Sequence, residues 1–293
     1  MTLQKKATIV ATITAGNLAV IKLVFGIMSG SVAILASAID SVLDLVISLF
    51  NYFAVNTAEK NPNEKFNYGF GKIEALAGVF EGSLIGFSGL YILYQAFSNY
   101  TTGTEIVNLE SSIIVMIISM VVTFCLVWFL NYVYKKTGSL VIKSDSLHYK
   151  TDLLTNASVL VSLGLVYLTS LNIIDSLVGG AIAIYIVYSA IGIIKESVFV
   201  LMDKSIDDEM IAQIEEIIKS KNRVSSFHCL KTRSAGNNIF VDVHVVFDKE
   251  ILLYDAHKVG DKIEDEIAKL DNSKEWVINI HLDPVDDFKD FNH

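Results

Sequence analysis

Two pairs of potential metal ligands lie at helical spacing inside apolar segments of the sequence. Asp40 and Asp44 stand in S-A-I-D-S-V-L-D-L-V, and His148 and Asp152 stand in H-Y-K-T-D. Residues four apart share one face of a helix, so each pair presents both of its side chains to the same side. Two such faces would together offer three carboxylates and one imidazole. Four ligands is the number that zinc takes in a closed tetrahedral site.

The apolar surroundings decide how these charges are interpreted. A charged side chain at the centre of a bilayer costs at least about 2.5–3.5 kcal/mol. One such Asp or His alone is more often a partner in helix packing than a metal ligand, but two pairs on two apolar segments favour a metal or proton site. Glu81 and Lys22 are single charges in other apolar segments. For both we expect helix packing or the lining of a water-filled cavity.

A second group of possible ligands lies near the C-terminus, where five of the six histidines follow Met202. Four of them are His228 and His244 on predicted strands, His257 on a predicted helix and His281 on a third strand. Asp283 should share a strand face with His281, because side chains alternate along a strand. Cys229 directly follows His228 and should face the other way as a structural cysteine. The alternative is a scatter of surface histidines without a common site.

The composition indicates which elements position these residues. Of the 293 residues, 52% are hydrophobic and only 19% are charged, which is unusual for a soluble domain. A bilayer core needs about 20 apolar residues in a helix. Six segments meet that requirement, at residues 7–28, 32–56, 73–97, 111–133, 147–168 and 173–200. We therefore predict an α-helical membrane protein with six transmembrane helices in a domain of residues 1–202.

Basic residues predict the orientation of these helices. Lysines lie before the first segment, between the second and third, between the fourth and fifth, and around the end of the sixth. They are Lys5, Lys6, Lys60, Lys65, Lys72, Lys135, Lys136, Lys143, Lys195 and Lys204. The connections at 29–31, 98–110 and 169–172 contain no Lys or Arg. Because cytoplasmic loops carry the excess of Lys and Arg, both termini should be cytoplasmic.

The remainder, residues 203–293, has a different pattern. Apolar spacing predicts a helix at 207–220, strands at 226–232 and 239–247, a helix at 256–270 and a strand at 276–281. The order α-β-β-α-β predicts a small cytoplasmic α+β domain. It holds 20 acidic and 12 basic residues, a net charge of −8. Such an acidic domain is a poor partner for nucleic acid.

The motifs together resemble the cation diffusion facilitator family. Those that carry the resemblance are the D-x-x-x-D and H-x-x-x-D pairs, N-Y-G-F-G-K-I-E before the third segment, and H-C-L-K-T-R, V-D-V-H, D-A-H-K-V-G-D and I-H-L-D-P near the C-terminus. The resemblance implies a homodimeric metal/proton antiporter in the lipid bilayer of the cell, with a metallochaperone-like cytoplasmic domain. It makes Asp40, Asp44, His148 and Asp152 the transport site. It makes His228, His244, His257, His281 and Asp283 a cytoplasmic Zn²⁺ site near the dimer interface.

Two further expectations follow from the resemblance. Lys72 should pair with Asp207 or Asp208 and couple the two domains. The histidine of the fifth segment favours Zn²⁺ as the exported ion, since manganese-type members generally lack it. The exchange of Zn²⁺ for protons is therefore the predicted activity, and Fe²⁺, Cd²⁺ or Mn²⁺ are alternative principal substrates.

Two functions of other classes remain as alternatives. In a membrane-anchored metal sensor the C-terminal domain would bind metal, and the helices would serve only as an anchor. An intramembrane metalloprotease needs an H-E-x-x-H string, which the sequence does not contain.

Overall fold

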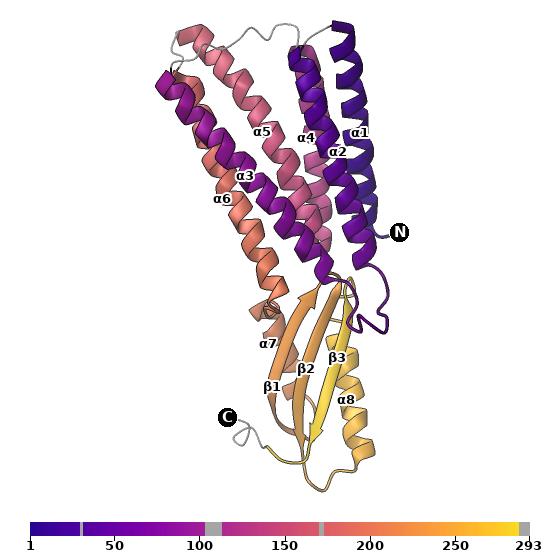
Figure 1. Cartoon of the computed structure of the whole chain (residues 1–293). Coiled ribbons are helices and arrows are strands. Elements are labelled where there is room, and N and C mark those ends of the chain that lie inside the picture. The colour runs from indigo at the N-terminus through magenta and orange to yellow at the C-terminus, as the bar shows by residue number, and fades with distance from the viewer. Residues whose placement is uncertain (30–31, 103–112, 170–172, 287–293) are drawn as a thin grey trace. The chain divides into compact units, whose positions relative to one another are not determined.

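The computed structural model describes residues 1–29, 32–102, 113–169 and 173–286. The chain divides into two compact units, Met1–Val198 and Phe199–His293, each with its own internal packing. Figure 1 shows a helical unit and a smaller unit that contains a sheet.

The first unit consists of six long helices. They are α1 (Leu3–Ser29), α2 (Val32–Ala58), α3 (Lys72–Thr102), α4 (Ile113–Thr137), α5 (Leu140–Thr169) and α6 (Ile173–Leu201). At 1.5 Å per residue, each is longer than the roughly 30 Å of a bilayer core. The prediction of six membrane helices is confirmed, although α5 begins seven residues before the predicted segment.

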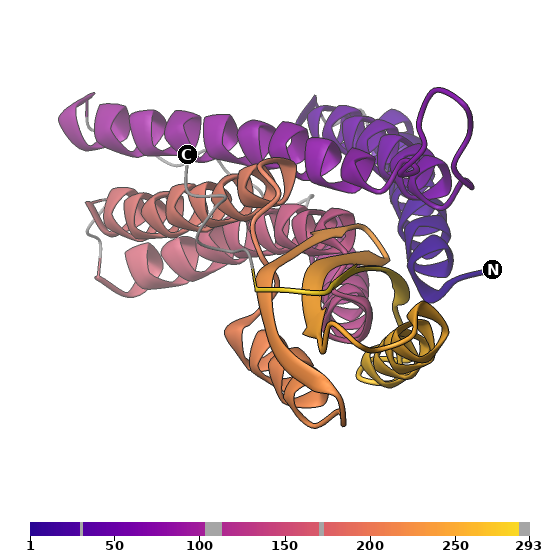
Figure 2. The ribbon, with the colours of Figure 1, turned by 90° about the horizontal axis from the view of Figure 1, so that it is seen from below.

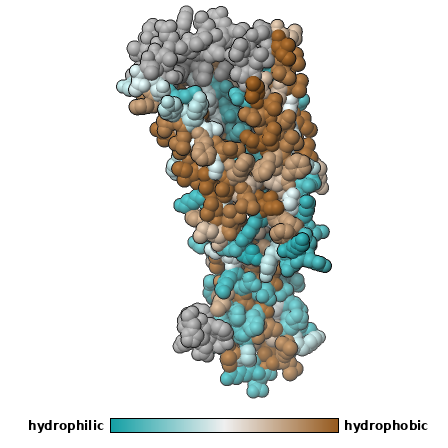
Figure 3. All heavy atoms as spheres, viewed as in Figure 1, coloured by the Kyte–Doolittle hydropathy of each residue, from teal (hydrophilic) through white to brown (hydrophobic). Residues whose placement is uncertain are grey.

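The outer surface of these helices is apolar. Large apolar side chains such as Phe87, Trp128 and Tyr188 are exposed, and Figure 3 shows a hydrophobic surface over the helical unit. Five helices contain a described window long and apolar enough to cross a membrane. The described part of α5 does not, because its first half carries four charged side chains and a histidine: Lys143, Asp145, His148, Lys150 and Asp152. This polar helix contacts α2, α3 and α4.

Close packing of α3 against α6 depends on small residues. A Cβ added at Gly82 would lie 2.9 Å from Ile194, and one at Gly89 would lie 2.9 Å from Ile186. Real Cβ atoms essentially never come that close, so only glycine allows this approach. Small residues at contacts between membrane helices commonly allow such close approach of backbones.

The second unit confirms the predicted α-β-β-α-β order. Its elements are α7 (Asp208–Lys219), β1 (Val224–Ala235), β2 (Asn238–Phe247), α8 (Leu253–Ile267) and β3 (Glu275–Asp283). The sheet order is β1-β2-β3, with β1 antiparallel and β3 parallel to β2.

One face of this sheet is covered and the other is polar. Ile214 of α7 and Ile263 of α8 are fully buried, and they belong to the same core as Val241, Val243 and Val245 of β2. Figure 2 shows both helices on the same side of the sheet. Side chains of alternate residues point to the opposite face, and that face carries the histidines.

Candidate metal centres

The first candidate centre lies between α2 and α5. The Nε2 atom of His148 lies 3.1 Å from Oδ1 of Asp44 and 3.9 Å from Oδ2 of Asp152. Ligand atoms of the three residues all lie within 4.8 Å of one another. Their helical spacing explains the arrangement: His148 and Asp152 are one turn apart on α5, and that face meets Asp44 on α2.

The structure does not bring Asp40 into this group. It lies one turn before Asp44 on α2, is exposed, and is not one of the three residues whose ligand atoms lie within 4.8 Å. A side chain one turn away can join a site by rotation about χ1 and χ2. The four-ligand set therefore stays a prediction, and three of its members are already adjacent.

Lys22 contacts the same region of α2. Its Nζ donates a hydrogen bond of 2.8 Å to the hydroxyl of Ser41, which is 1% exposed. Ser41 lies between Asp40 and Asp44 in the sequence. Lys22 thus places a positive charge beside the acidic face of α2, as a contact between two membrane helices.

Sequence analysis missed a buried polar group farther along α2 and α5. Asn51, Glu81 and Asp145 are all at most 1% exposed, and the Asn51 amide hydrogen-bonds to both carboxyl groups. Glu81 thus joins α3 to α2 and α5 through hydrogen bonds from Asn51 and Ser144. The sequence contains a sign of this group: Asp145 precedes His148 by three residues, and Asn51 follows Asp44 by seven, so each shares a helix face with the metal cluster.

The second candidate centre is a row of three histidines across the sheet. His228 of β1 pairs in register with His244 of β2, which pairs with His281 of β3. Their ring centroids are separated by 5.0 Å and 4.6 Å. The row arises because each strand contributes one histidine at the same register position.

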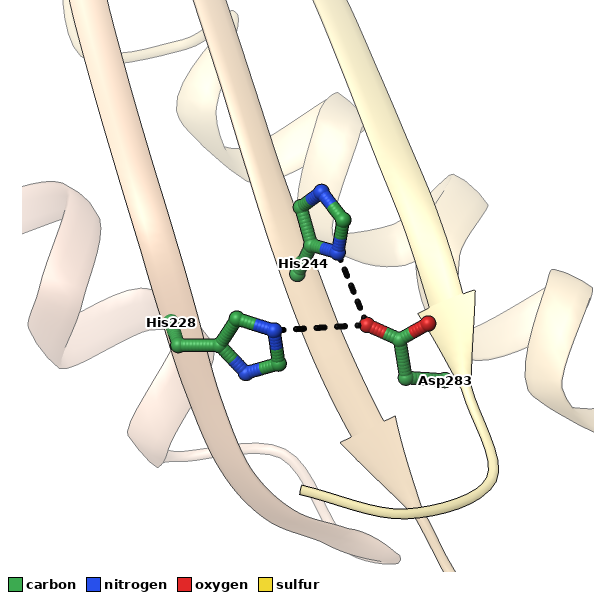
Figure 4. Close-up of side chains that lie close together, drawn as sticks. All are labelled: His228, His244 and Asp283. Atoms are coloured by element: carbon green, nitrogen blue, oxygen red, sulfur yellow. Dashed lines mark hydrogen bonds and ion pairs between the residues drawn. The ribbon is translucent and has the colours of Figure 1, made fainter. Parts of the chain in front are cut away.

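Asp283 joins all three histidines. Its Oδ2 lies 2.8 Å from Nδ1 of His244 and 3.6 Å from Nε2 of His228, and its Oδ1 lies 3.1 Å from Nε2 of His281. Figure 4 shows His228, His244 and Asp283 pointing toward one another from three strands. Asp286, which was not predicted, lies 3.7 Å from Nδ1 of His228. Imidazole and carboxylate are the donors that suit zinc, so these side chains fit that metal.

His257 is not brought to this row within one chain. It lies on α8, its side chain is 71% exposed, and its Nε2 lies 3.7 Å from Asp261. Farther along α8, burial raises the pKa of Glu264, and the neighbouring carboxylate of Asp261 raises it further. Acidic side chains of α8, with Asp261 the nearest, thus lie along the helix next to His257.

The strand at Cys229 is irregular. The register of β1 against β2 shifts between His228 and Lys231, and Cys229 has a positive φ of 51°. Such a bulge interrupts the alternation of side chains. The expectation that Cys229 simply faces away from His228 assumed a regular strand, which the structure does not have here. Cys229 is a half-buried free thiol.

The predicted charge pair involves both units. Lys72 begins α3 in the first unit, whereas Asp207 caps and Asp208 begins α7 in the second. Each residue lies at the helix end that the sequence indicated, and the pairing itself stays a prediction.

A helical unit of membrane length with an Asp–His–Asp cluster inside, joined to a small α+β domain, defines a membrane transporter of metal ions. Residues 8–202 match the family model described as the cation efflux transmembrane domain, and residues 206–285 match that of the cation efflux protein cytoplasmic domain. The chain belongs to this family, the cation diffusion facilitators, and is a transporter rather than an enzyme.

Curated relatives agree with this assignment. The chain is 33% identical over 282 residues to the cation-efflux pump FieF of Citrobacter koseri, covering 96% of this chain and 93% of that protein. It is 32% identical, with the same coverage, to the FieF pumps of Shigella boydii serotype 18 and Escherichia coli O1:K1. Membership of a transporter family excludes the metalloprotease alternative and leaves no support for a sensor that only anchors itself in the membrane.

Proposed function

We propose that the chain exports a divalent transition-metal ion, with Zn²⁺ as the preferred substrate, in exchange for protons. The observation that carries this proposal is the group of Asp44, His148 and Asp152, whose ligand atoms lie within 4.8 Å of one another on two membrane helices. Ionisable residues inside a membrane domain are costly, and they mark ion pathways and proton relays.

The donor set supports zinc. One imidazole with carboxylates is a borderline ligand set that suits zinc, whereas manganese, magnesium and calcium suit all-oxygen sites. Fe²⁺ and Cd²⁺ share part of zinc's preference for such ligands, so they are the ions most able to compete with Zn²⁺ for this site. The curated relatives are named only as cation-efflux pumps, so the preference rests on His148.

Charge balance supports proton exchange. If Asp40 rotates inward, three carboxylates and one Zn²⁺ sum to −1. Without the ion, uncompensated carboxylates in an apolar interior are unfavourable, so protons should replace the metal. An imidazole ordinarily exchanges its proton near pH 6.5, close to the cytoplasmic pH. A site that holds either metal or protons, and opens to each side in turn, is an antiporter.

The remaining assignments complete the proposal. The distribution of lysines supports cytoplasmic termini and insertion in the cell membrane, so the C-terminal unit would face the cytoplasm. There His228, His244, His281 and Asp283 would hold a resident Zn²⁺, which supplies positive charge to an acidic domain. His257 can become a ligand only if a second chain contributes it, which supports a homodimer with this site near the interface.

Proteoliposomes test the proposal. The full chain is reconstituted with a pH-sensitive dye inside, and metal is added outside. The wild-type chain should move protons in response to Zn²⁺, and Asp152→Ala should not. Lys150→Ala is the matched control, because Lys150 lies between the ligands in sequence but donates its hydrogen bond to Tyr185. Equal fluxes in all three proteins would contradict the proposal.

A further inference from the structure

Glu81, Asn51 and Asp145 form a group on α3, α2 and α5 that the metal cluster does not include. The side-chain amide of Asn51 donates hydrogen bonds to Oε2 of Glu81 at 3.2 Å and to Oδ1 of Asp145 at 3.1 Å. The hydroxyl of Ser144 also donates to Oε2 of Glu81. The second oxygens, Oε1 of Glu81 and Oδ2 of Asp145, are buried and accept no hydrogen bond from the described residues.

In the part of the chain that the structure describes, the carboxyl groups of Glu81 and Asp145 have no lysine or arginine partner, and the imidazole of His148 is the one basic group that acts on both. Lys143, the basic residue nearest to Asp145 in sequence, pairs with Glu196 of α6 instead. Two ionised carboxylates in this interior would be strongly unfavourable. Two carboxyl groups that share a site resolve this conflict when one of them keeps a proton.

The group is aligned with the metal cluster. Three side-chain contacts join α2 and α5 in this region: Asp44 with His148, Ser48 with Tyr149 at 2.6 Å between their hydroxyl oxygens, and Asn51 with Asp145. The metal cluster and this group are three residues apart on α5, from His148 to Asp145, and seven apart on α2, from Asp44 to Asn51, a separation of about 5–10 Å along the helices. Charges this close in an apolar interior interact strongly.

We propose that Glu81 and Asp145, bridged by Asn51, form a proton-binding site that is separate from the metal ligands and loses its shared proton when the transported metal binds. The proposal rests on the proposed metal/proton exchange and assigns one counter-proton to named residues. The titratable groups that act on the pair are His148, Asp44 and Tyr149.

The step is balanced in charge and atoms. With the metal site empty, the pair holds one proton and carries a charge of −1. Arrival of a divalent ion at the cluster offsets a further negative charge nearby, so one O–H bond breaks, the proton passes to water and the pair becomes −2. When the ion leaves, a proton from water returns to a carboxyl oxygen. By linkage, a proton on the pair weakens metal binding to the same extent that metal weakens proton binding.

The experiment measures proton release by the full chain in detergent. Zn²⁺ binding is titrated at several pH values in a His228→Ala, His244→Ala background, so that the C-terminal centre does not contribute. The slope of log Kd against pH gives the number of protons released per ion. In Glu81→Gln and in Asp145→Asn this slope should fall by about one, because each variant leaves a single carboxyl that need not share a proton.

Glu74→Gln is the matched control. Glu74 is another buried carboxyl of α3, two turns before Glu81, and the hydroxyl of Ser139 donates to it at 2.5 Å. Its replacement should leave the slope unchanged. An equal fall in this control would overturn the proposal, because the effect would then not belong to the pair.

Infrared difference spectra detect the shared proton directly, first in the chain that keeps both carboxyl groups. Zn²⁺ should remove a carbonyl band of a protonated carboxyl, and that band should shift in D₂O and be missing in Glu81→Gln. Absence of such a band in the chain without these substitutions would overturn the proposal, even if the variants did not fold.

The outcomes separate this proposal from the proposed function. If Zn²⁺ releases no protons from any form, metal/proton exchange itself fails, and this proposal fails with it. If protons are released but the slopes of Glu81→Gln and Asp145→Asn match the parent, only this proposal fails. If either variant binds one Zn²⁺ fewer per chain, the pair is a metal site, and the proton assignment is wrong.

Discussion

The two candidate metal centres use the same side chains on different secondary structures. In the membrane unit, one histidine and two aspartates are brought together by one-turn spacing on two helices. In the C-terminal unit, three histidines and an aspartate are brought together by register across three strands. In the membrane centre the ligands are half-buried, with His148 15% and Asp152 38% exposed. The C-terminal centre instead combines a fully packed base, where His228 and Asp283 are 6% and 8% exposed, with an open side at His281, which is 64% exposed.

This difference fits two different tasks. A transport site must bind its ion, open to both sides and release it, so access is part of its function. A resident metal must stay, and ligands fixed by packing and by cross-strand contacts hold it more tightly. The comparison therefore predicts that the membrane centre controls flux and that the C-terminal centre controls stability and association.

The largest effect should come from Asp152→Ala. Groups that only support a metal ligand are worth about 10–100-fold in affinity or activity, so loss of a ligand should reduce Zn²⁺ transport by about 100-fold or more. His244→Ala, at the C-terminal centre, should reduce it far less. Transport assays in proteoliposomes measure the loss of Zn²⁺ transport in each variant. Circular dichroism shows whether both variants are folded. Comparable losses in the two variants would break the distinction between the centres.

The next effect concerns metal choice. His148→Asp removes the only nitrogen of the membrane centre and adds a negative charge, so Zn²⁺ transport should weaken relative to Mn²⁺. A competition assay with Zn²⁺, Cd²⁺, Fe²⁺ and Mn²⁺ measures the ranking. The pH dependence near neutrality should also change, because the imidazole is gone. If ranking and pH dependence are both preserved, the selectivity lies in other residues.

A smaller effect is expected at the C-terminal centre. At a free Zn²⁺ concentration of 100 times Kd, binding should stabilise this unit by about 2.7 kcal/mol. His228→Ala should abolish this stabilisation. Chemical unfolding of residues 203–293 with and without Zn²⁺ measures the free energy of unfolding in both cases. The unit carries a net charge of −8, so bound cations should also tighten its dimer by offsetting repulsion.

His257→Ala is the informative control for that experiment. Because His257 lies away from the histidine row within one chain, its loss should leave stabilisation of the monomer intact and weaken only the metal-dependent dimer. Scattering of the unit with and without Zn²⁺ measures the second quantity. A full loss of stabilisation in the monomer would show that His257 reaches the row within its own chain.

The smallest effect should come from Lys72→Ala. An exposed ion pair contributes at most about 1 kcal/mol, so a pair with Asp207 or Asp208 would set the register of the two units more than their stability. Crosslinking and transport should change only slightly. If both are unaltered, the pair is incidental.

The helices and strands, and some of the ligands of each metal centre, could be predicted from the sequence alone. Six apolar segments and an α-β-β-α-β order have strong periodic patterns, and one-turn spacing places His148 beside Asp152 without further information. The sequence could not show that Asp40 lies outside the group, because a shared helix face does not fix a rotamer.

Tertiary contacts explain what was missed. Glu81 is an isolated charge in the sequence, and only the packing of α3 against α2 and α5 brings it to Asn51. Asp145 lies before the predicted fifth segment, so its place inside a helix was not foreseen. The bulge at Cys229 requires a positive φ, and a cysteine at this position does not indicate one.

X-ray absorption of bound zinc tests the central claim most directly. Zn²⁺ is bound to the full chain in the His228→Ala, His244→Ala background, so that the spectrum reports the membrane centre. The account predicts one zinc per chain, with one imidazole nitrogen and carboxylate oxygens as ligands, and an all-oxygen spectrum after His148→Asp. No bound zinc, or a spectrum that His148→Asp leaves unchanged, would contradict it.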